Sequence, residues 1–495
     1  MCGIVGIIKK SNGVAVDLYE SLLMLQHRGQ DAAGIVTGNG LFFREKKDNG
    51  LVKDVFHQDD MIALDGFIGM GHVRYPTSGT LNASEAQPFF VNAPYGIYLI
   101  HNGNLTNADL LREKVMKKYR RHLRTKSDSE VLLNVFADKI HQQLKDESDI
   151  NDIDRIFEAV KMTMKDLEGA YSVLCLIDEV GLLAFRDPHG IRPLCMGKRS
   201  TSRGNEWAFA SENVAFSPIQ FEKVRDVIPG EAIIVTHDGT VHQRQCAKGQ
   251  LNPCIFEYVY LARPDSILDG ISVYKTQLRL GQTLAKQIKK ANLKIDSIVP
   301  VPDSSRPVAL EISKELGIKY REGLVKNRYV GRTFIMPGQE IREKSVRRKL
   351  NIIGLEFRNR NVLLVDDSIV RGTTMRQIIE MCRQAGAKKI YVASAAPPVI
   401  FPNVYGVDMP TRRELVANQL DTEEVQKILG ADALFYQKLE DLIWAAREGN
   451  PEIETFEDSC FSGNYVTKDI TEKYLADLEI RQERIDEEPI SLPNI

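Results

Sequence analysis

Long hydrophobic runs and a strong excess of one charge are both missing from the sequence. No segment approaches the roughly eighteen consecutive apolar residues of a membrane-spanning helix, and the N-terminus lacks the basic and apolar regions of a secretion signal. Lysine and arginine total 65 against 67 aspartate and glutamate, so neither a nucleic-acid coat nor a polybasic membrane anchor is favoured. We expect a cytoplasmic protein with no membrane and no nucleic-acid partner.

Cysteine is also scarce. The seven cysteines among 495 residues are scattered, and no two have the CxxC spacing. Such an odd, dispersed set argues against a disulfide framework and against a cysteine-based zinc site. Free, dispersed cysteines of this kind are typical of proteins in a reducing compartment. The hydrophobic content of 43% supplies enough apolar material for the cores of two to four domains.

The N-terminal part, residues 2–235, alternates short apolar runs with Gly, Asn and Asp. This pattern predicts strands, at residues 4–8, 69–73, 97–100, 171–177 and 231–235. Helical periodicity predicts helices over residues 17–26 and 129–142, the second with Asp128 as its candidate N-cap. We therefore expect an α+β domain built from layered antiparallel sheets with helices.

A polar stretch at residues 236–253 is the predicted boundary between the two parts. Beyond it, predicted helices alternate with predicted strands, at residues 273–291, 307–316 and 374–385 for the helices and 295–301, 361–365 and 390–395 for the strands. This alternation favours an α/β domain with a mostly parallel sheet. We assign residues 254–470 to it, with helices from about residue 411, and expect the acidic tail at 471–495 to be mobile.

The most informative motif is VLLVDDSIVRGTT at residues 362–374. An apolar strand ends at Asp366 and Asp367, and a loop of small residues leads into the next helix. In a parallel sheet, such a loop lies where ligands bind. Its amides, hydroxyls and helix N-terminus favour phosphate, whereas the carboxylates suit sugar hydroxyls or a divalent cation. A phosphorylated ribose satisfies both, and a buried strand with an acidic turn is the alternative.

This motif resembles the phosphoribosyl diphosphate signature of the type I phosphoribosyltransferases. The resemblance implies that the substrate is bound by Asp366, Asp367, Ser368, Arg371, Gly372, Thr373 and Thr374. It also implies one Mg²⁺ per subunit, bound together with the substrate. The metal would lie near Asp366, Asp367 and Ser304, the last of which ends the segment IVPVPDS at residues 298–304.

A dense basic segment at residues 326–350 separates these two motifs and includes Lys326, Arg332 and Lys349. A solvated surface or a nucleic-acid patch is the alternative interpretation. Because the rest of the chain has no basic bias, we interpret the segment as a lid that folds over pyrophosphate. Closure would exclude water and stabilise a leaving group with dispersed negative charge.

The chain begins MCGIVGI, which places a cysteine directly after the initiator methionine. Removal of Met1 would leave Cys2 with a free α-amino group, whose reference pKa is about 7.7–8.0. That amine can accept the thiol proton at cellular pH and so generate the nucleophilic thiolate. A buried structural thiol is the alternative.

Acyl transfer also needs oxyanion donors and groups that hold the substrate. In HNGNL, the Asn102 side chain and the Gly103 N–H form a natural donor pair. Arg74 in GHVRYPTSG suits an α-carboxylate, and Asp128 in SDSE suits an α-ammonium group. Taken singly, Arg74 is as readily an ion-pair partner, Asp128 a helix cap and Asn102 a turn residue. As a set they fit glutamine.

Together with Cys2 and LQHRGQDAAG at residues 25–34, these motifs resemble the class II, N-terminal-nucleophile glutamine amidotransferases. The resemblance implies that Cys2 attacks the glutamine amide, that Asn102 and Gly103 stabilise the oxyanion, and that Arg74 and Asp128 hold the substrate's backbone groups. By this resemblance, residues 2–235 form the amidotransferase domain and residues 254–470 the phosphoribosyltransferase domain.

The two halves together resemble the glutamine phosphoribosylpyrophosphate amidotransferases, which are pentosyltransferases at the entry to purine synthesis. The resemblance implies that glutamine, phosphoribosyl diphosphate and water give 5-phosphoribosylamine, glutamate and diphosphate through a Cys2 thioester and channelled ammonia. It further implies a homotetramer inhibited by purine nucleotides.

One departure from the family concerns a subgroup with a [4Fe–4S] cluster held by four cysteines. Cys254 and Cys460 match two of its ligands, but Asn403 and Glu457 stand at the other two positions. Because such clusters normally need four thiolates, we expect no iron–sulfur cluster.

Two other functions explain fewer of these motifs. The first is a class II amidotransferase with another acceptor, such as a sugar phosphate. That function does not explain the acid pair before the small-residue loop. The second is a non-enzymatic sensor that binds a phosphoribosyl ligand and binds nucleic acid through residues 326–350. That function does not explain Cys2 and its oxyanion residues.

Overall fold

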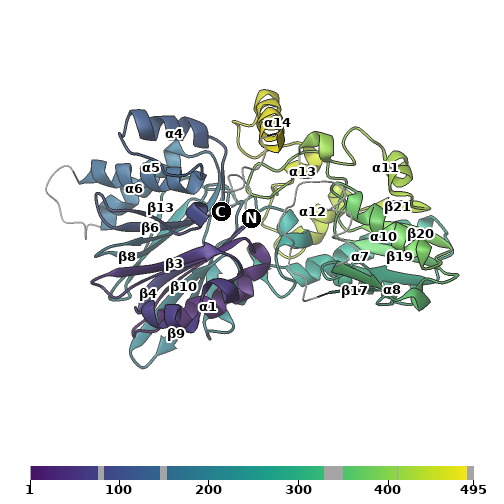
Figure 1. Cartoon of the computed structure of the whole chain (residues 1–495), viewed down its shortest axis with the longest axis horizontal. Helices are drawn as coiled ribbons and strands as arrows, with labels where there is room; N and C mark the ends of the chain where they lie inside the picture. Colours follow the sequence, from purple (N-terminus) through teal and green to yellow (C-terminus); the bar gives the residue numbers. More distant parts are fainter. Residues whose placement is uncertain (1, 76–82, 145–152, 328–348, 410, 488–495) are drawn as a thin grey trace, which may run out of the picture.

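The computed structural model describes residues 2–75, 83–144, 153–327, 349–409 and 411–487, which form two lobes side by side (Figure 1). The N-terminal lobe contains two large sheets, and the other lobe contains a smaller one. Within the described ranges, no helix combines the length and apolar character that crossing a membrane requires.

Both sheets of the first lobe are antiparallel. The seven-stranded sheet has the order β11-β9-β10-β1-β4-β2-β3, with bounds Gly3–Ile8 (β1), Ala32–Gly38 (β2), Phe43–Asn49 (β3), Ile68–Arg74 (β4), Cys195–Thr201 (β9), Gly204–Ala210 (β10) and Glu222–Asp226 (β11). The six-stranded sheet has the order β13-β12-β8-β7-β6-β5, with bounds Phe89–Val91 (β5), Ile97–Leu105 (β6), Gly169–Ile177 (β7), Gly181–Arg186 (β8), Glu231–Thr236 (β12) and Val241–Gln245 (β13).

Helices cover the outer faces of these sheets. Because side chains alternate along a strand, Ile4 and Ile8 of β1 fill the core between the sheets, whereas Val5 and Ile7 pack on the helix side. The first sheet carries α1 (Val14–Leu25), with α2 (Val52–Val55) and α3 (Gln58–Ala63) nearby; the second carries α4 (Ala108–Lys117), α5 (Asp128–Gln143) and α6 (Ile153–Asp166). The result is a helix–sheet–sheet–helix sandwich, as the predicted α+β class requires.

Several predicted boundaries in this lobe need correction. The first helix begins at Val14 because Gly13, in the left-handed conformation, turns the chain into it. The N-cap of α5 is Ser127, whose side chain accepts a hydrogen bond from Ser129 N, and Asp128 is the first helical residue. The strand predicted at 97–100 continues to Leu105. The predicted boundary stretch, 236–253, contains β13, an edge strand of the second sheet.

The second lobe contains a parallel sheet with helices on both faces. Its order is β16-β19-β20-β21, with bounds Ser297–Pro300, Asn361–Asp366, Lys389–Ser394 and Ala433–Tyr436. Along β19, Leu363 and Val365 pack with one core, and Val362 and Leu364 with the other. The helices are α7 (Val273–Lys290), α8 (Arg306–Leu316), α10 (Thr373–Gln384), α11 (Thr422–Leu429) and α12 (Leu439–Arg447).

The C-terminal part also differs from the prediction. The chain after residue 411 is not purely helical, because β21 joins the parallel sheet. Within the acidic tail, α14 (Glu472–Glu487) is helical, and its Glu472 pairs with Arg412 at 3.1 Å. The remaining short elements are β14 (Ile267–Leu268), β15 (Ile271–Ser272), β17 (Leu324–Lys326), β18 (Leu350–Ile352), α13 (Ser459–Ser462), a π-helix at Glu257–Leu261 and 3₁₀ turns at Gln26–Arg28, Ala83–Glu85, Asn213–Phe216, Gly354–Glu356 and Arg412–Glu414.

Buried charges join the two lobes. Arg28 Nη2 lies 2.7 Å from Glu257 Oε2, and Arg192 Nη2 lies 2.6 Å from Glu257 Oε1. Arg28 also pairs with Glu212, which accepts a 3.1 Å hydrogen bond from Arg263 N of the second lobe. Burial alone would raise the pKa of Glu212, but Arg28 and His27 hold it well below its usual range.

Candidate active sites

The first candidate site surrounds Cys2, which is buried directly before β1. Its N–H donates to Asn102 Oδ1 at 3.2 Å, and its Sγ lies 3.8 Å from the carbonyl oxygen of Tyr75 at the end of β4. One hundred residues of sequence separate Cys2 from Asn102, and the two sheets of the sandwich bring them together. The predicted nucleophile and oxyanion residue are therefore neighbours.

Asn102 and Gly103 lie within β6, not after a strand as the sequence suggested. They are paired with Ser172 and Tyr171 of β7. Because Asn102 Oδ1 accepts from Cys2 N, the amide nitrogen Nδ2 points elsewhere. That nitrogen is buried and has no hydrogen-bond partner in the described part of the chain. A Cβ on Gly103 would lie 1.9 Å from the carbonyl oxygen of Ala170, so glycine is required there.

Arg74 and Asp128, the two residues expected to hold the substrate, already have protein partners. Arg74 Nη2 lies 2.6 Å from Glu85 Oε2, and both side chains are buried. Asp128 Oδ2 accepts a 3.0 Å hydrogen bond from Leu105 N and lies 3.8 Å from His101 Nδ1. Asp128 is thus bonded to the strand that carries Asn102, and Arg74 directly precedes Tyr75, whose carbonyl oxygen lies near Cys2 Sγ.

Two further residues, His101 and Gln87, lie beside Asn102 and were not predicted from the sequence. His101, the first residue of HNGNL, is buried, and burial lowers its pKa although Asp128 opposes the change. Its Nδ1 lies 3.1 Å from Ser129 Oγ. Gln87, in the segment EAQPF, contacts the backbone of His101. No local pattern marks Gln87, because its contact with His101 forms only when the chain folds.

The second lobe reaches the Cys2 site through residues 403–408. Asn104 Nδ2 donates to the carbonyl oxygen of Val404 at 2.9 Å, and Tyr75 Oη donates to Asp408 Oδ2 at 3.3 Å. A Cβ on Gly406 would lie 2.8 Å from the Gly103 carbonyl carbon. The backbone of this loop therefore packs directly on an oxyanion residue, a contact over about 300 residues that no local pattern signals.

The second candidate site lies at the carboxyl end of β19. Asp366 is the last residue of that strand, and its Oδ1 accepts from Asp367 N at 3.0 Å. Asp367 Oδ1 accepts from Ser368 Oγ at 2.7 Å, and its Oδ2 accepts a short hydrogen bond from Ser304. Burial and the charge of Asp367 raise the pKa of Asp366 well above its usual value, and burial also raises the pKa of Asp367.

The loop after this acid pair leads directly into α10. Gly372 has a φ of 73° and precedes Thr373, the first helical residue, with Thr374 next. Glycine suits this left-handed position. Arg371, which was expected to bind substrate, pairs with Glu414 in the structure: its Nε lies 2.6 Å from Glu414 Oε2. The fold thus assembles the loop and helix N-terminus expected of an anion site.

The proposed lid is only partly described. Lys326 ends β17 and is the register partner of Leu350 in β18, so the two ends of the basic segment meet. Lys326 Nζ lies 3.4 Å from Asp303 Oδ2, beside Ser304. The carbonyl oxygen of Lys349 accepts from Asn327 N at 2.8 Å. Arg332 lies outside the described residues.

The four positions compared with an iron–sulfur subgroup lie together. Asn403 Nδ2 donates to Glu457 Oε2 at 3.1 Å, and Cys254 is the bridge partner of Glu457. Cys460 is buried nearby, and its pKa is raised by burial and by the charge of Glu457. Among the described residues, no group of three or more His, Cys, Asp or Glu is placed to hold a metal ion.

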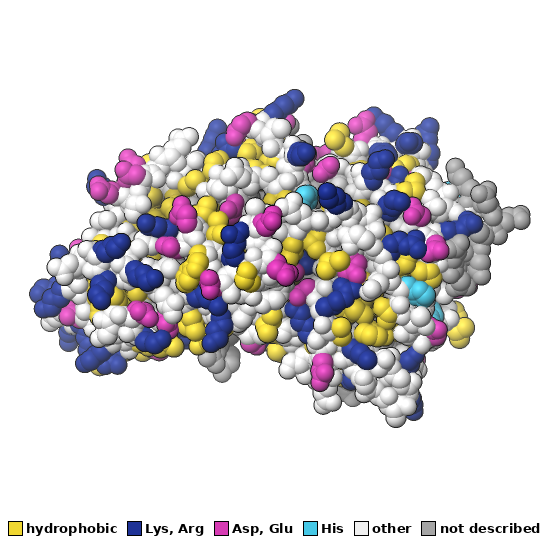
Figure 2. Space-filling model, turned by 180° about the vertical axis from the view of Figure 1, so that it is seen from behind, with side chains coloured by type: hydrophobic (Ala, Val, Ile, Leu, Met, Phe, Trp, Pro, Cys, Tyr) yellow, Lys and Arg dark blue, Asp and Glu magenta, His cyan; other side chains and the backbone are white. Residues whose placement is uncertain are grey.

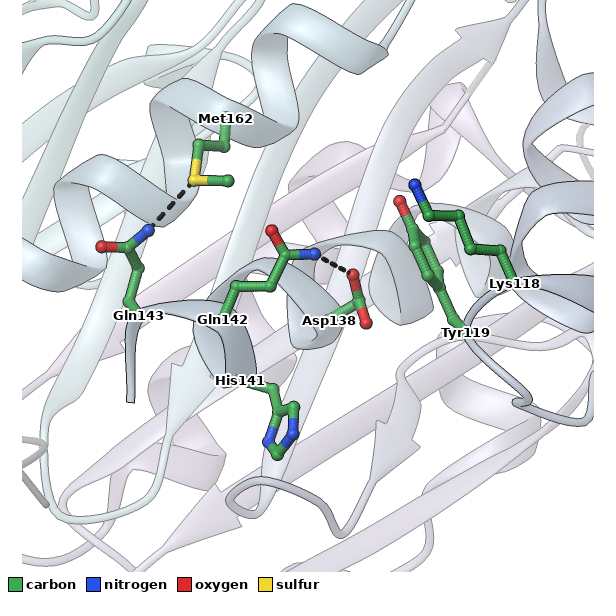
Figure 3. Close-up of a pocket in the computed structure, with 7 residues that line it drawn as sticks. All are labelled: Lys118, Tyr119, Asp138, His141, Gln142, Gln143 and Met162. Atoms are coloured by element: carbon green, nitrogen blue, oxygen red, sulfur yellow. Dashed lines mark hydrogen bonds between the residues drawn. The ribbon is translucent and has the colours of Figure 1, made fainter. Parts of the chain in front are cut away.

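A cavity of about 530 Å³ lies apart from both sites, beside α5 and α6. Figure 3 shows its lining, which consists of Lys118, Tyr119, Asp138, His141, Gln142, Gln143 and Met162. Two contacts of 2.6 and 3.1 Å, Gln142–Asp138 and Gln143–Met162, tie lining side chains to one another. It contains no predicted site residue, and we assign it no substrate.

Comparison with known proteins gives one family for both lobes. A glutamine amidotransferase domain profile matches residues 72–218, and a phosphoribosyl transferase domain profile matches residues 272–398. An amidophosphoribosyltransferase of Pasteurella multocida is 54% identical over 480 residues, which cover 96% of this chain and 94% of that protein.

Solved structures agree with these sequence matches. The glutamine phosphoribosylpyrophosphate amidotransferase of B. subtilis, complexed with ADP and GMP, matches with a TM-score of 0.83 at 34% identity, covering 95% of this chain and 98% of that one. A structure described as the allosteric regulatory enzyme of purine biosynthesis has a TM-score of 0.84 at 33% identity, with 97% and 99% covered. The predicted fold class and the order of the two lobes are confirmed, and the chain belongs to the amidophosphoribosyltransferase family.

Proposed function

We propose that the chain is a pentosyltransferase that converts glutamine, phosphoribosyl diphosphate and water to 5-phosphoribosylamine, glutamate and diphosphate, the entry step of purine synthesis. The observation that carries this proposal is that one chain holds two separate sites. One combines Cys2 with Asn102, and the other combines Asp366 and Asp367 with the loop into α10.

At the first site, the Cys2 thiolate attacks the glutamine amide after its proton passes to the α-amino group. Asn102 Nδ2, buried and unpaired within the described residues, and the Gly103 N–H stabilise the oxyanion. The α-ammonium group returns that proton to the departing nitrogen, so ammonia leaves, and water then hydrolyses the Cys2 thioester to glutamate. The substrate carboxylate binds Arg74 beside Glu85, and its ammonium group binds Asp128.

At the second site, Asp366 and Asp367 bind the ribose hydroxyls, and Ser368, Arg371, Gly372, Thr373 and Thr374 bind the phosphate. The acid pair fits Mg²⁺, because two crowded carboxylates with raised pKa values have no lysine or arginine partner among the described residues. Asp366, Asp367 and Ser304 would hold one ion per subunit. It would neutralise charge on the diphosphate leaving group.

Ammonia passes inside the protein to carbon 1 of the ribose, since in water it would be protonated and lost. Residues 403–408 pack on Gly103 and so link the two lobes beside the place where ammonia forms. Lys326, Arg332 and Lys349 of the lid stabilise the departing diphosphate.

Three further expectations come from the family resemblance. The chain assembles as a homotetramer in the cytoplasm, and purine nucleotides inhibit it. The B. subtilis relative is complexed with ADP and GMP, so that protein binds purine nucleotides. On the face in Figure 2, basic and acidic side chains lie interspersed among the other described residues.

The decisive experiment measures glutamate and diphosphate release together, with glutamine and Mg²⁺, in the presence and absence of phosphoribosyl diphosphate. Equal release that requires the sugar substrate supports both sites and their coupling. Glutamate release without diphosphate would refute the proposed acceptor, and fructose 6-phosphate would then be tested in its place.

A further inference from the structure

We propose that Gln87 is a positioning residue of the glutamine site, which holds the backbone of His101 and thereby aims the neighbouring Asn102. The inference rests on the proposed role of Asn102 as an oxyanion donor. Gln87 would not touch substrate; it would act through the strand that carries Asn102.

The Gln87 side chain contacts both the backbone N–H and the backbone carbonyl of His101. Its Oε1 accepts from His101 N at 2.6 Å, and its Nε2 lies 3.4 Å from the His101 carbonyl oxygen. The same Nε2 donates to Ser129 Oγ at 3.0 Å. Gln87 is only 5% exposed. A buried amide with both ends satisfied has little freedom to move.

The position of Gln87 explains why an amide is needed. On one side, β6 pairs with β7 as far as Leu105. On the other side, the β5 ladder covers only residues 97–99, opposite residues 89–91. His101 therefore lies beyond the last ladder pair, where a buried N–H and carbonyl would lack partners. The Gln87 side chain supplies the donor and the acceptor that a continuing strand would have supplied.

Gln87 is itself held firmly on its other side. A Cβ on Gly34 of β2 would lie 2.0 Å from the Gln87 carbonyl oxygen, so that backbone packs closely on the first sheet. Ser129 Oγ also lies 3.1 Å from His101 Nδ1, which closes a network of three side chains. The network joins β2, β6 and α5 at the residue before Asn102.

The alignment of Asn102 is where this network affects catalysis. Asn102 Oδ1 must meet Cys2 N while Nδ2 faces the developing oxyanion. Loss of one oxyanion donor typically costs about 100- to 1,000-fold in kcat, and a displacement of about 1 Å can cost about 100-fold. Releasing His101 should misalign Asn102 without removing it.

The test compares Gln87→Met with Asn107→Leu as a matched control. Asn107 is also an amide clamp in this lobe: its Nδ2 donates to the Asp166 carbonyl oxygen at 2.9 Å, and its Oδ1 accepts from Glu168 N at 3.2 Å. Gln87→Met should lower kcat for glutamine hydrolysis by about 10- to 100-fold, with a KM for glutamine within a few-fold of wild type. Ammonia-dependent synthesis should persist in both variants, and Asn107→Leu should keep its glutamine kcat.

Gln87→Glu, which keeps the acceptor for His101 N, provides a second variant if Gln87→Met does not fold. It should lose less kcat than Asn102→Ala while keeping ammonia-dependent synthesis. Equal kcat losses in Gln87→Met and Asn107→Leu, or a wild-type glutamine kcat in a folded Gln87 variant, would overturn the inference. Cys2→Ala separates the two proposals, because retained glutamine hydrolysis there would refute the glutamine site itself.

Discussion

At the scale of single residues, each candidate site contains buried polar side chains whose surroundings are unfavourable in the free protein. Asn102 uses its oxygen on Cys2 N and leaves a buried amide nitrogen without a partner in the described chain. Asp366 and Asp367 sit side by side with raised pKa values. Such groups reduce stability in the free protein, and a ligand that pairs with them would offset that cost.

Cys2→Ala should abolish glutamine-dependent synthesis and spare ammonia-dependent synthesis. Alanine removes the nucleophile but leaves the acid pair and the loop into α10 untouched. Phosphoribosylamine formation is measured with each nitrogen source. Loss of both activities in a folded variant would contradict the separation of the two sites.

Asp366→Asn should stabilise the free protein while weakening substrate binding. The asparagine Oδ1 can still accept from Asp367 N, yet the like charge and the cost of burying it disappear. We expect the free energy of unfolding at neutral pH to rise by about 0.5–2 kcal/mol. Urea unfolding measures the gain, and calorimetry measures phosphoribosyl diphosphate affinity with Mg²⁺. An unchanged affinity would remove Asp366 from the site.

At the scale of elements, strand ends and one loop position the chemistry. β19 places Asp366 and Asp367 at the sheet edge where α10 begins. β6 extends beyond the end of β5, and this extension contains Asn102 and Gly103. The loop at residues 403–408 connects the lobes, because Gly406 packs on Gly103 and Val404 accepts from Asn104.

Gly406→Ala tests this contact. Gly406 has a φ of 93°, and its added Cβ would lie 2.8 Å from the Gly103 carbonyl carbon. Gly430→Ala is the matched control, since Gly430 has a φ of 74° with nothing within 4 Å of the new Cβ. Both variants should lose about 1–2 kcal/mol to the left-handed backbone. Only Gly406→Ala should also lower glutamine-dependent kcat, by about 10-fold or more; equal kinetics in the two variants would argue against coupling through this loop.

At the scale of the whole molecule, buried ion pairs hold the lobes together. Glu212 of the first lobe meets Arg28 and His27 and accepts from Arg263 N of the second. Removing one member leaves a buried charge without its partner, which is more costly than removing a surface pair.

Glu212→Gln should lower the free energy of unfolding at pH 7 by about 3–5 kcal/mol. Because the folded-state pKa of Glu212 lies below its usual value, its contribution is complete above about pH 4.3 and is lost as pH falls through the folded pKa. The difference between wild type and variant should therefore shrink in acid, as measured by urea unfolding across pH. Glu113→Gln, in the exposed pair with Lys117, should leave the free energy of unfolding nearly unchanged, because solvent screens that pair; a loss as large as that of Glu212→Gln would contradict the argument.

Local chemistry was readable from the sequence because it depends on neighbours in the chain. Three features indicate their chemistry within a dozen residues of sequence. They are the cysteine after Met1, the acid pair that ends an apolar strand, and the small-residue loop before a helix. The alternation of strands and helices likewise predicted the parallel sheet. The limits of elements were less readable, since β6 extends beyond its apolar run and β21 follows residues expected to be helical.

Tertiary structure alone decided which of these groups meet. Cys2 contacts Asn102, Gln87 holds His101, and Gly406 packs on Gly103. These contacts join residues that different strands and loops bring to one place, so no periodicity or motif marks them. The sequence by itself determined the reactive groups and the family they resemble. Packing between the sheets and between the lobes determined their orientation, because a side chain's direction depends on everything buried against it.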